Sequence, residues 1–357
     1  MTPGRPDVDV LVVGAGPVGF ATAIEARLAG LTVMVLEPRE PAIDKACGEG
    51  LMPGALPALE RLGVKPPGHL LRGVSYLSGE LRVDHLWRTG TGLGVRRTTL
   101  SAALAGRAHE LGVERDEIKV TGVEQSETSV TAIGLSTSQL IPRPRSITAR
   151  YLIGADGLHS TVRSLSGLTV AVPERRRRYG FRQHFAVAPW SDLIEVHWMP
   201  DVEAYVTPVA DDTVGVAVLG ARGTNLNEVI GRIPSLAGRL AGATATSSLR
   251  GAGPFRQGAS RRVDGRVLLV GDASGYVDAI TGEGIRLGLS QARSAIDCIV
   301  AGRPALYERE WARETRDFRM LTSGLVAAAQ SGLRSRIVPT AVALPRLFGS
   351  VVERLAR

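Results

Sequence analysis

The fold is decided by the stretch Val8-Asp9-Val10-Leu11-Val12-Val13-Gly14-Ala15-Gly16-Pro17-Val18-Gly19 near the start of the chain. Its apolar, β-branched opening predicts a buried parallel strand, and a helical pattern then continues to Gly30. Gly14 allows a sharp turn, Gly16 lets the backbone approach a pyrophosphate, and Gly19 lets the helix pack on the strand. The free N–H groups of the helix start, which follows Gly16 at Pro17, favour an anion at this place.

A second apolar strand follows at Leu31–Leu36 and ends at Glu37, 18 residues beyond Gly19. A carboxylate at this distance from the glycine turn binds the hydroxyl groups of a ribose. The order of strand, glycine turn, helix, strand and acidic residue therefore predicts a dinucleotide-binding unit of parallel strands joined by a helix.

Composition indicates a globular chain of 357 residues, with 44% hydrophobic residues and a length that suits two interleaved domains. We find no secretory signal and no run of 18 apolar residues, and the two cysteines, Cys47 and Cys298, do not form a disulfide framework. These features favour a reducing, cytoplasmic location. The net charge of +8 comes from arginine without a basic stripe interleaved with aromatic residues, so we expect no nucleic-acid partner. A basic surface still suits NADPH or an anionic membrane.

Along the chain, helical and parallel-strand patterns alternate with runs of short alternating strands, which predicts an α/β fold. A Rossmann-like nucleotide-binding domain is interleaved with an antiparallel-sheet substrate domain, and helices follow at the C-terminus. We assign residues 1–70, 94–172 and 263–318 to the first domain, residues 71–93 and 173–262 to the second, and residues 319–357 to the C-terminal helical segment.

Four motifs together resemble the superfamily of flavoprotein monooxygenases and geranylgeranyl reductases, which share the fold of p-hydroxybenzoate hydroxylase. They are the first glycine loop, the helix that starts at Arg97, the turn Gly154-Ala155-Asp156-Gly157 and the pair Gly271-Asp272. The resemblance covers about residues 8–300 and implies bound FAD, with NADH or NADPH as the electron donor.

The resemblance also implies where FAD is contacted. Asp272 would accept a hydroxyl of the ribitol or ribose, Arg97 would lie on the phosphates, and Cys47 would lie near the flavin ring. Asp156 is interpreted equally well as a cofactor contact or as a turn-stabilising residue. The helix start after Thr281-Gly282-Glu283-Gly284 would face the flavin pyrimidine edge and stabilise negative charge there. The complete expected set is Gly14, Gly16, Pro17, Gly19, Glu37, Arg39, Cys47, Gly48, Arg97, Asp156, Gly271, Asp272, Gly282, Glu283, Gly284 and Ile285.

The motifs that separate the two branches of this superfamily give mixed indications. Gly275 stands where the hydroxylases carry a histidine, as in the prenyl reductases, and Lys45-Ala46-Cys47-Gly48 is also similar to the reductases. The reductases' Tyr-x-Trp-x-Phe-Pro stretch is represented here only by Pro208. The halogenase motif is missing as well, because Trp190 and Trp198 are too far apart.

We therefore expect an NAD(P)H-dependent FAD monooxygenase that hydroxylates or epoxidises an aromatic or polyketide-like small molecule. In the family, reduced flavin and O₂ form a C4a-hydroperoxide for this purpose. The alternative is an FAD-dependent reductase of carbon–carbon double bonds in a lipid-like, prenyl substrate. A third possibility is a flavin-binding protein without turnover.

Candidate catalytic residues lie on the expected strands of the second domain. With a period of two, Arg182 and His184 share one strand face, Glu195 and His197 share another, and Tyr205 and Thr207 share a third. Such a pattern is typical of the solvent face of an antiparallel sheet, which we favour slightly, and also of a polar substrate wall. The histidines are weak candidates for general bases, and Arg182 and Tyr205 are weak candidates as well. The catalytic set stays open at this point.

Two further segments remain. The run Arg175–Arg178 predicts a solvated loop, with the gathering of an anionic partner as the alternative. The last forty residues predict two helices around Pro339 that pack over the substrate domain, with peripheral membrane contact as the alternative.

Overall fold

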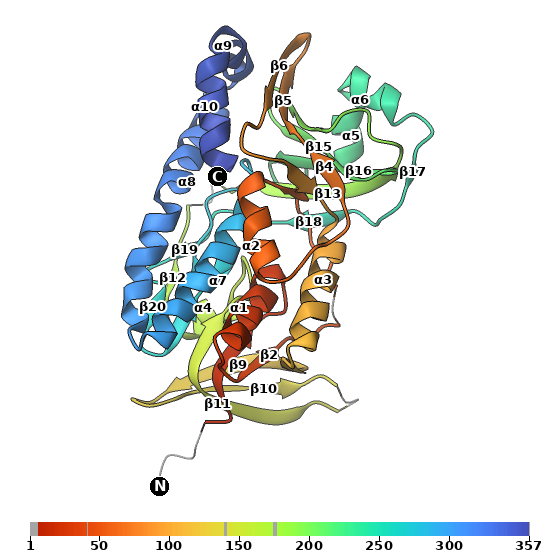
Figure 1. The fold of residues 1–357 in the computed structure, drawn as a ribbon. Coiled ribbons are helices and arrows are strands. Elements are labelled where there is room, and N and C mark those ends of the chain that lie inside the picture. Colours follow the sequence, from red (N-terminus) through yellow and green to blue (C-terminus); the bar gives the residue numbers. More distant parts are fainter. Residues whose placement is uncertain (1–5, 41, 139–140, 174–176, 357) are drawn as a thin grey trace.

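In the computed structural model, residues 6–40, 42–138, 141–173 and 177–356 are described. The chain forms two large sheets, with helices between and around them, and two small ones (Figure 1). Arg175 and Arg176 of the predicted solvated loop lie outside the described residues. The α/β class predicted from the sequence is confirmed.

The first sheet is built around β1 (Val8–Val13), the strand that opens the glycine motif. It lies between β2 (Val33–Leu36) and β11 (Arg143–Gly154), and both neighbours run parallel to it. The other members are β8 (Glu114–Asp116), β9 (Ile118–Gln125), β10 (Val130–Ser136), β20 (Val263–Asp264) and β21 (Val267–Leu269). Parallel strands buried on both faces explain the continuous apolar runs in this part of the sequence.

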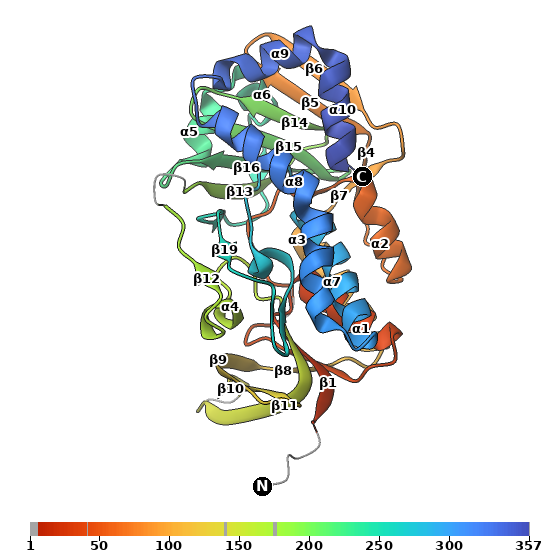
Figure 2. The same cartoon turned by 90° about the vertical axis from the view of Figure 1, so that its left-hand side faces the viewer.

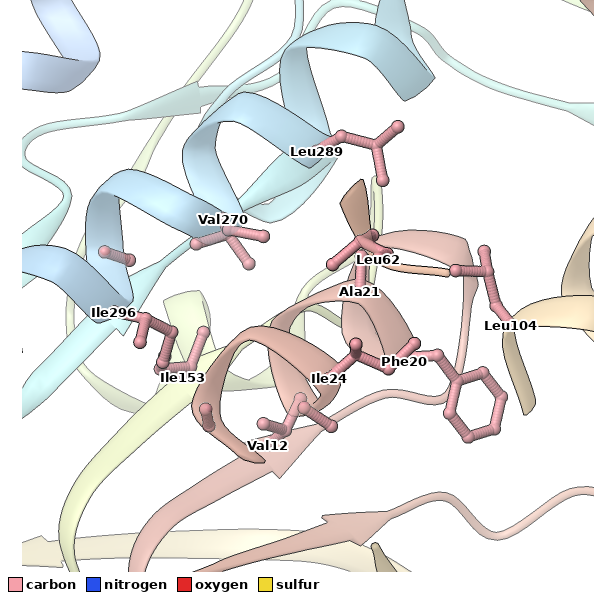
Figure 3. Close-up of a cluster of buried hydrophobic side chains, with 14 of the residues drawn as sticks. Val12, Phe20, Ala21, Ile24, Leu62, Leu104, Ile153, Val270, Leu289 and Ile296 are labelled. Atoms are coloured by element: carbon pink, nitrogen blue, oxygen red, sulfur yellow. The ribbon is translucent and has the colours of Figure 1, made fainter. Parts of the chain in front are cut away.

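Helices cover one face of this sheet, and the hydrophobic core lies between the sheet and these helices (Figure 3). They are α1 (Pro17–Leu28), α2 (Leu56–Arg61), α3 (Arg97–Glu110) and α7 (Gly284–Val300); the short α4 (Thr161–Leu165) follows β11. Val12 and Ile153 from the strands pack with Ile24 of α1 and Ile296 of α7, and all four are fully or almost fully buried. This packing fixes the start of α1 and the start of α7 relative to the same sheet edge.

The second sheet is mostly antiparallel and joins two distant parts of the chain. It consists of β5 (Gly73–Ser78), β6 (Leu81–Leu86), β13 (Tyr179–Ala186), β14 (Leu193–Trp198), β15 (Glu203–Ala210), β16 (Thr213–Gly220), β17 (Thr244–Ala245) and β18 (Arg250–Ala252). β5 pairs in parallel with β14. The strands β5 and β6 therefore belong to the same sheet as the later strands of the second domain, as the sequence predicted. The exact domain boundaries stay predictions. α5 (Leu226–Gly231) and α6 (Pro234–Arg239) pack on this sheet.

Shorter elements connect the two halves. β3 (Gly50–Leu51), β4 (His69–Leu71) and β7 (Gly92–Gly94) form one small sheet, and β12 (Thr169–Val170) pairs with β19 (Gly258–Ala259). Single 3₁₀ turns occur at η1 (Pro53–Ala55), η3 (Gly271–Ser274), η4 (Pro304–Leu306) and η5 (Arg334–Arg336).

The C-terminal helices differ from the expected pair. α8 (Tyr307–Ala329) runs from the first half of the molecule to the second, and α9 (Ile337–Ala343) and α10 (Pro345–Ala356) lie over β5 and β6 (Figure 2). Pro339 lies in the first turn of α9, where its missing N–H has no intrahelical partner to lose. Phe348 of α10 packs on Tyr76 with ring centroids 4.9 Å apart. Among the helices of the described residues, none combines the length and the apolar character needed to cross a membrane.

Candidate functional site

The main cavity, of about 450 Å³, lies between the carboxyl edge of the first sheet and one face of the second sheet. The glycine turn after β1, the turn after β11 and the Gly271-Asp272 pair after β21 all open into it. In an open parallel sheet, the carboxyl ends of the strands are where ligands bind. The opposite wall comes from β5, β13, β14, β15 and β16, together with Val352 and Leu355 of α10.

The glycine turn has the geometry that the sequence predicts. Gly14 has φ +108°, and a Cβ atom there would lie 2.6 Å from the carbonyl oxygen of Ala155. A Cβ atom on Gly19 would lie 1.8 Å from the carbonyl oxygen of Gly14, so Gly19 permits the close packing of α1 but does not line the cavity. Gly16 faces open space, where a Cβ atom would meet only the guanidinium of Arg97 at 3.5 Å. Pro17 is the first residue of α1.

Positive charge gathers beside this turn. Glu37 is 2% exposed at the end of β2, and its carboxylate accepts a hydrogen bond from the Ala15 N–H at 3.2 Å and pairs with Arg39 at 2.7 Å. Lys45 lines the cavity nearby, and burial together with the charges of Arg97 and Arg39 lowers the pKa of its ammonium group. Cationic groups this close to each other favour an anionic ligand.

The two acidic turn residues lie on the same cavity wall. One carboxylate oxygen of Asp156 accepts from the Val162 N–H at 3.0 Å, and the other is buried without a hydrogen-bond partner among the described residues. Asp156 therefore stabilises its turn and also lines the cavity. Asp272 follows Gly271, which has φ +60°. Burial raises the pKa of the Asp272 carboxyl, while Arg97 and Lys45 act in the opposite direction.

The loop before α7 brings Thr281 and Gly282 to the cavity and the first turn of α7 brings Gly284 and Ile285, whereas Glu283 is not among the residues that line it. Glu283 is buried behind the loop and forms an ion pair with Arg286. Burial raises the pKa of the Glu283 carboxyl to about 7, and one of its oxygens has no hydrogen-bond partner among the described residues. Gly282 has φ +72°, the conformation that allows the chain to turn into the helix.

The polar residues of β13 and β14 are buried, with Glu195 5% and His197 7% exposed, and Thr207 of β15 is 2% exposed, so the slight preference for a solvent face was wrong. Arg182 and His184 are each 1% exposed. The reason is tertiary: the loop of residues 44–49 covers them, with Asp44 paired to Arg182 and the Glu49 carboxylate 2.5 Å from His184 Nε2. Arg182 donates to His184 Nδ1 at 3.1 Å. His184 Nδ1 also lies 2.9 Å from the Ser247 hydroxyl, and where Nδ1 accepts from Arg182, a proton on Nε2 is directed at Glu49.

The candidate catalytic residues therefore fall into two groups, those that line the cavity and those that do not. Arg182 and Tyr205 line the cavity, and the Tyr205 hydroxyl donates to the Ile280 carbonyl at 3.1 Å. His184 has both ring nitrogens engaged and does not line the cavity, and His197 lies on the opposite face of β14 from the cavity residues Ile194 and Val196. Neither histidine is placed to act as a general base on a substrate in this cavity.

Glu49 is the functional candidate that the sequence reasoning missed. It has φ +58° and is 4% exposed, and its carboxylate also accepts from the backbone N–H of Arg97 at 2.8 Å. Its partners lie 48 and 135 residues away in the chain. No local pattern predicts such contacts, although its place in a glycine-rich loop is a weak indication.

Arg178 also corrects an expectation, because it is not solvated. Its guanidinium pairs with Glu203 and, at 3.0 Å, with Asp278, and it is 6% exposed. Arg334 pairs with Glu203 at 2.7 Å from the turn before α9. This buried network, residues Arg178, Glu203, Asp278 and Arg334, ties the second sheet to the segment before the loop that starts at Thr281 and to the C-terminal helices.

These features define a dinucleotide-binding fold with a cavity between its first sheet and a second sheet. The chain belongs to the FAD binding domain family, whose model matches residues 7–301. It is similar to the menaquinone reductase of Mycolicibacterium smegmatis, with 26% identity over 336 residues that cover 85% of this chain and 79% of that protein. It is also similar to the 12-dehydrotetracycline 5-monooxygenase/anhydrotetracycline 6-monooxygenase of Streptomyces rimosus, with 29% identity over 321 residues, 80% of this chain and 61% of that protein.

Further relatives at comparable identity are again divided between reductases and monooxygenases. Among solved structures, a flavoprotein/dehydrogenase from Cytophaga hutchinsonii superposes with a TM-score of 0.79 at 19% identity, covering 98% of this chain and 96% of that one. The fold is thus shared with flavoproteins, and the resemblance to the monooxygenase and reductase superfamily is confirmed.

The residues of the cavity fit FAD. The open backbone at Gly16 leaves room for a pyrophosphate, and the cationic groups of Lys45 and Arg97 lie beside it. The Arg97 Nε is buried and has no hydrogen-bond partner among the described residues, so a phosphate oxygen would satisfy it. Glu37 follows directly on β2, and its contact with a ribose stays a prediction. We therefore expect Gly14 to Pro17, Glu37, Arg97, Asp272 and the loop 281–285 to hold FAD.

Proposed function

We propose that this protein is an NAD(P)H-dependent FAD monooxygenase acting on an aromatic or polyketide-like small molecule that carries an oxygen substituent. The observation behind this proposal is the Nε–H of Arg182, which is buried, belongs to a residue that lines the cavity and has no hydrogen-bond partner among the described residues. A buried donor without a partner costs about 1–3 kcal/mol. A phenol, enol or ketone oxygen of a bound substrate would satisfy it.

The rest of this wall is suited to a planar apolar body. Val74, Tyr76, Ile194, Val196 and Phe255 line it without offering a free charge. Apolar walls of this kind bind a ligand by burying its surface and keep water from the reacting atoms. Arg182 would then fix which end of the substrate faces the flavin. FAD, when bound in this cavity, would supply the redox chemistry between NAD(P)H and O₂.

The network behind the wall would keep Arg182 in position. Asp44 and Glu49 both pair with Nη2 of Arg182, and His184, which is hydrogen-bonded to Nη1, connects Arg182 to Glu49. Since Glu49 also accepts from the Arg97 N–H, the substrate-facing arginine and the phosphate-facing arginine share one support. We expect this shared support to keep the substrate in register with the cofactor.

A second candidate is an FAD-dependent reductase of carbon–carbon double bonds in a lipid-like substrate. The observation that favours it is Cys47, which lines the cavity and whose thiol pKa is raised by burial. A neutral thiol can donate the proton that such a reduction requires after hydride transfer. The relatives named as reductases are compatible with this alternative.

Product analysis separates the candidates. Holoenzyme is incubated with NADH or NADPH and a panel of phenolic, polyketide and prenylated compounds, with and without O₂, and products are identified by mass. Gain of one oxygen atom that requires O₂ supports the monooxygenase, and gain of two hydrogens without O₂ supports the reductase. Absence of nicotinamide oxidation with every compound contradicts both and leaves a flavin-binding protein without turnover.

Arg182→Lys tests directly whether the Nε–H group of Arg182 binds the substrate. It keeps the charge toward Asp44 and Glu49 but removes the Nε–H donor, so we expect a higher KM for the oxygenated substrate with unchanged FAD content. Arg250→Lys is the matched control, because Arg250 pairs with Asp44 at 3.1 Å yet does not line the cavity. Equal KM values in the two variants would contradict the assigned role.

A further inference from the structure

A second cavity, of about 280 Å³, lies on the far side of the Gly271–Tyr276 segment from most of the main cavity. Its walls come from β12, β19, the start of α7 and the middle of α8, whose arrangement can be followed in Figure 2. Gly271, Asp272, Tyr276 and Gly284 line both cavities, so the two share one wall. Nothing in the proposed reaction uses this second cavity.

Three arginines line it, and only one of them is neutralised by an acid. Arg262 pairs with Glu308 at 3.1 Å and stacks on the Trp311 ring, with its Cζ 3.6 Å from the ring centroid. Arg319 lies 5.0 Å from the same ring. Neither Arg319 nor Arg256 forms a hydrogen bond or an ion pair with any residue that the structure describes. Arg256 is partly buried, and Arg319 is solvent-exposed.

Other charges around the cavity do not cancel this excess. Asp272 is the one acidic residue among the described residues that line it, and Arg97, Lys45 and Arg163 act on the Asp272 carboxyl from outside this cavity. Burial, with the positive charges of Arg262 and Arg256, lowers the pKa of the Arg319 guanidinium. Three guanidinium groups that affect one another, of which one is paired with an acid, give this cavity an excess of positive charge that favours an anionic ligand.

We propose that this cavity is a binding site for a phosphate-bearing ligand, held as a phosphomonoester or a diphosphate by Arg256, Arg262 and Arg319. Guanidinium groups bind phosphate oxygens through paired, charge-assisted hydrogen bonds. Trp311 and Phe318 provide an apolar surface for the uncharged part of the same ligand. The ligand is either the phosphorylated end of a pyridine nucleotide or another phosphorylated small molecule.

Inorganic pyrophosphate is the direct probe, because it tests the site without any turnover. We expect calorimetric titration of the FAD-loaded enzyme to show binding, and the double variant R256Q/R319Q to weaken it at least about tenfold, the loss expected for removed charge-assisted bonds. The matched control is R313Q/R316Q, which removes two charges from α8 at side chains that are 75% and 80% exposed and lie outside both cavities. It should bind pyrophosphate as the parent does.

The variant R256K/R319K keeps the charges and should retain binding within a few-fold, which would attribute the loss in R256Q/R319Q to the removed charges. If no parent binding is detected, or if R256Q/R319Q and R313Q/R316Q bind equally, the proposal is overturned. Neither result depends on the monooxygenase proposal, because no substrate is consumed.

Nicotinamide kinetics then identify the source of the phosphate. If R256Q/R319Q raises the KM for NADPH much more than for NADH, the ligand group is the 2′-phosphate of NADPH. An equal rise for both indicates their common pyrophosphate. Loss of pyrophosphate binding with both KM values unchanged indicates a different phosphorylated ligand at the same site.

Discussion

Glu283 should make the protein less stable at alkaline than at mildly acidic pH. Its side chain is fully buried, its ion-pair partner Arg286 is itself 20% exposed, and one carboxylate oxygen lacks a hydrogen-bond partner among the described residues. Burial raises the pKa of this carboxyl from the ordinary 4.5 to about 7. Because the folded state holds the proton more tightly than the unfolded state, the stabilisation is complete below about pH 4.5 and is lost as the pH rises to 7.

The size of the effect follows from that difference. At about 1.4 kcal/mol for each pH unit, a carboxyl that titrates at about 7 instead of 4.5 costs about 3 kcal/mol of unfolding free energy once it is fully ionised. Most of this cost, about 2–3 kcal/mol, should appear between about pH 5 and pH 8. Glu283→Gln removes the charge with little change of shape. It should therefore be close to the parent in stability near pH 5 and more stable than the parent near pH 8.

Urea unfolding of parent and variant at both pH values, with the same excess of FAD, measures this difference. The control is Glu80→Gln, which removes an exposed glutamate in the turn between β5 and β6 and should follow the parent at both pH values. A difference between Glu283→Gln and the parent that stays constant within about 0.5 kcal/mol would refute the reasoning, since the carboxyl would then titrate alike in the folded and unfolded states.

Three further predictions concern the cofactor and the buried network. Acid precipitation should release FAD into the supernatant, and flavin that stays in the pellet would instead make Cys47 or a histidine a covalent anchor. Glu37→Ala should weaken FAD binding about tenfold or more, because it removes charge-assisted hydrogen bonds to the ribose. Gly16→Val should weaken FAD binding further, because the valine side chain fills the open space at the turn. If both variants retain FAD as the parent does, the interpretation of the glycine turn is wrong. Arg178→Ala should lower the free energy of unfolding by about 3–5 kcal/mol, because it leaves the buried Asp278 without its ion-pair partner. Thermal unfolding measures this loss, and Arg313→Ala, at an exposed position, should change the free energy of unfolding little in that assay.

The sequence by itself determined the nucleotide-binding half of the protein. The strand, the glycine turn, the helix and the carboxylate at Glu37 are contiguous, and each depends on short-range properties: apolar runs, helix starts, and a backbone conformation at Gly14 that favours glycine. The same is true of the Gly271-Asp272 turn. Local patterns of this kind are visible before any tertiary contact is known.

Only the tertiary structure decided what the second sheet does. A period of two identified which residues share a face with Arg182, but the face that becomes buried depends on what packs against it. Here that is the loop carrying Glu49, 135 residues away from His184 in the chain. Arg178 and the arginines of the second cavity follow the same rule. A charged residue in a sequence is by default predicted to be exposed to solvent. Only the arrangement of distant elements decides whether its side chain is paired, buried or available to a ligand.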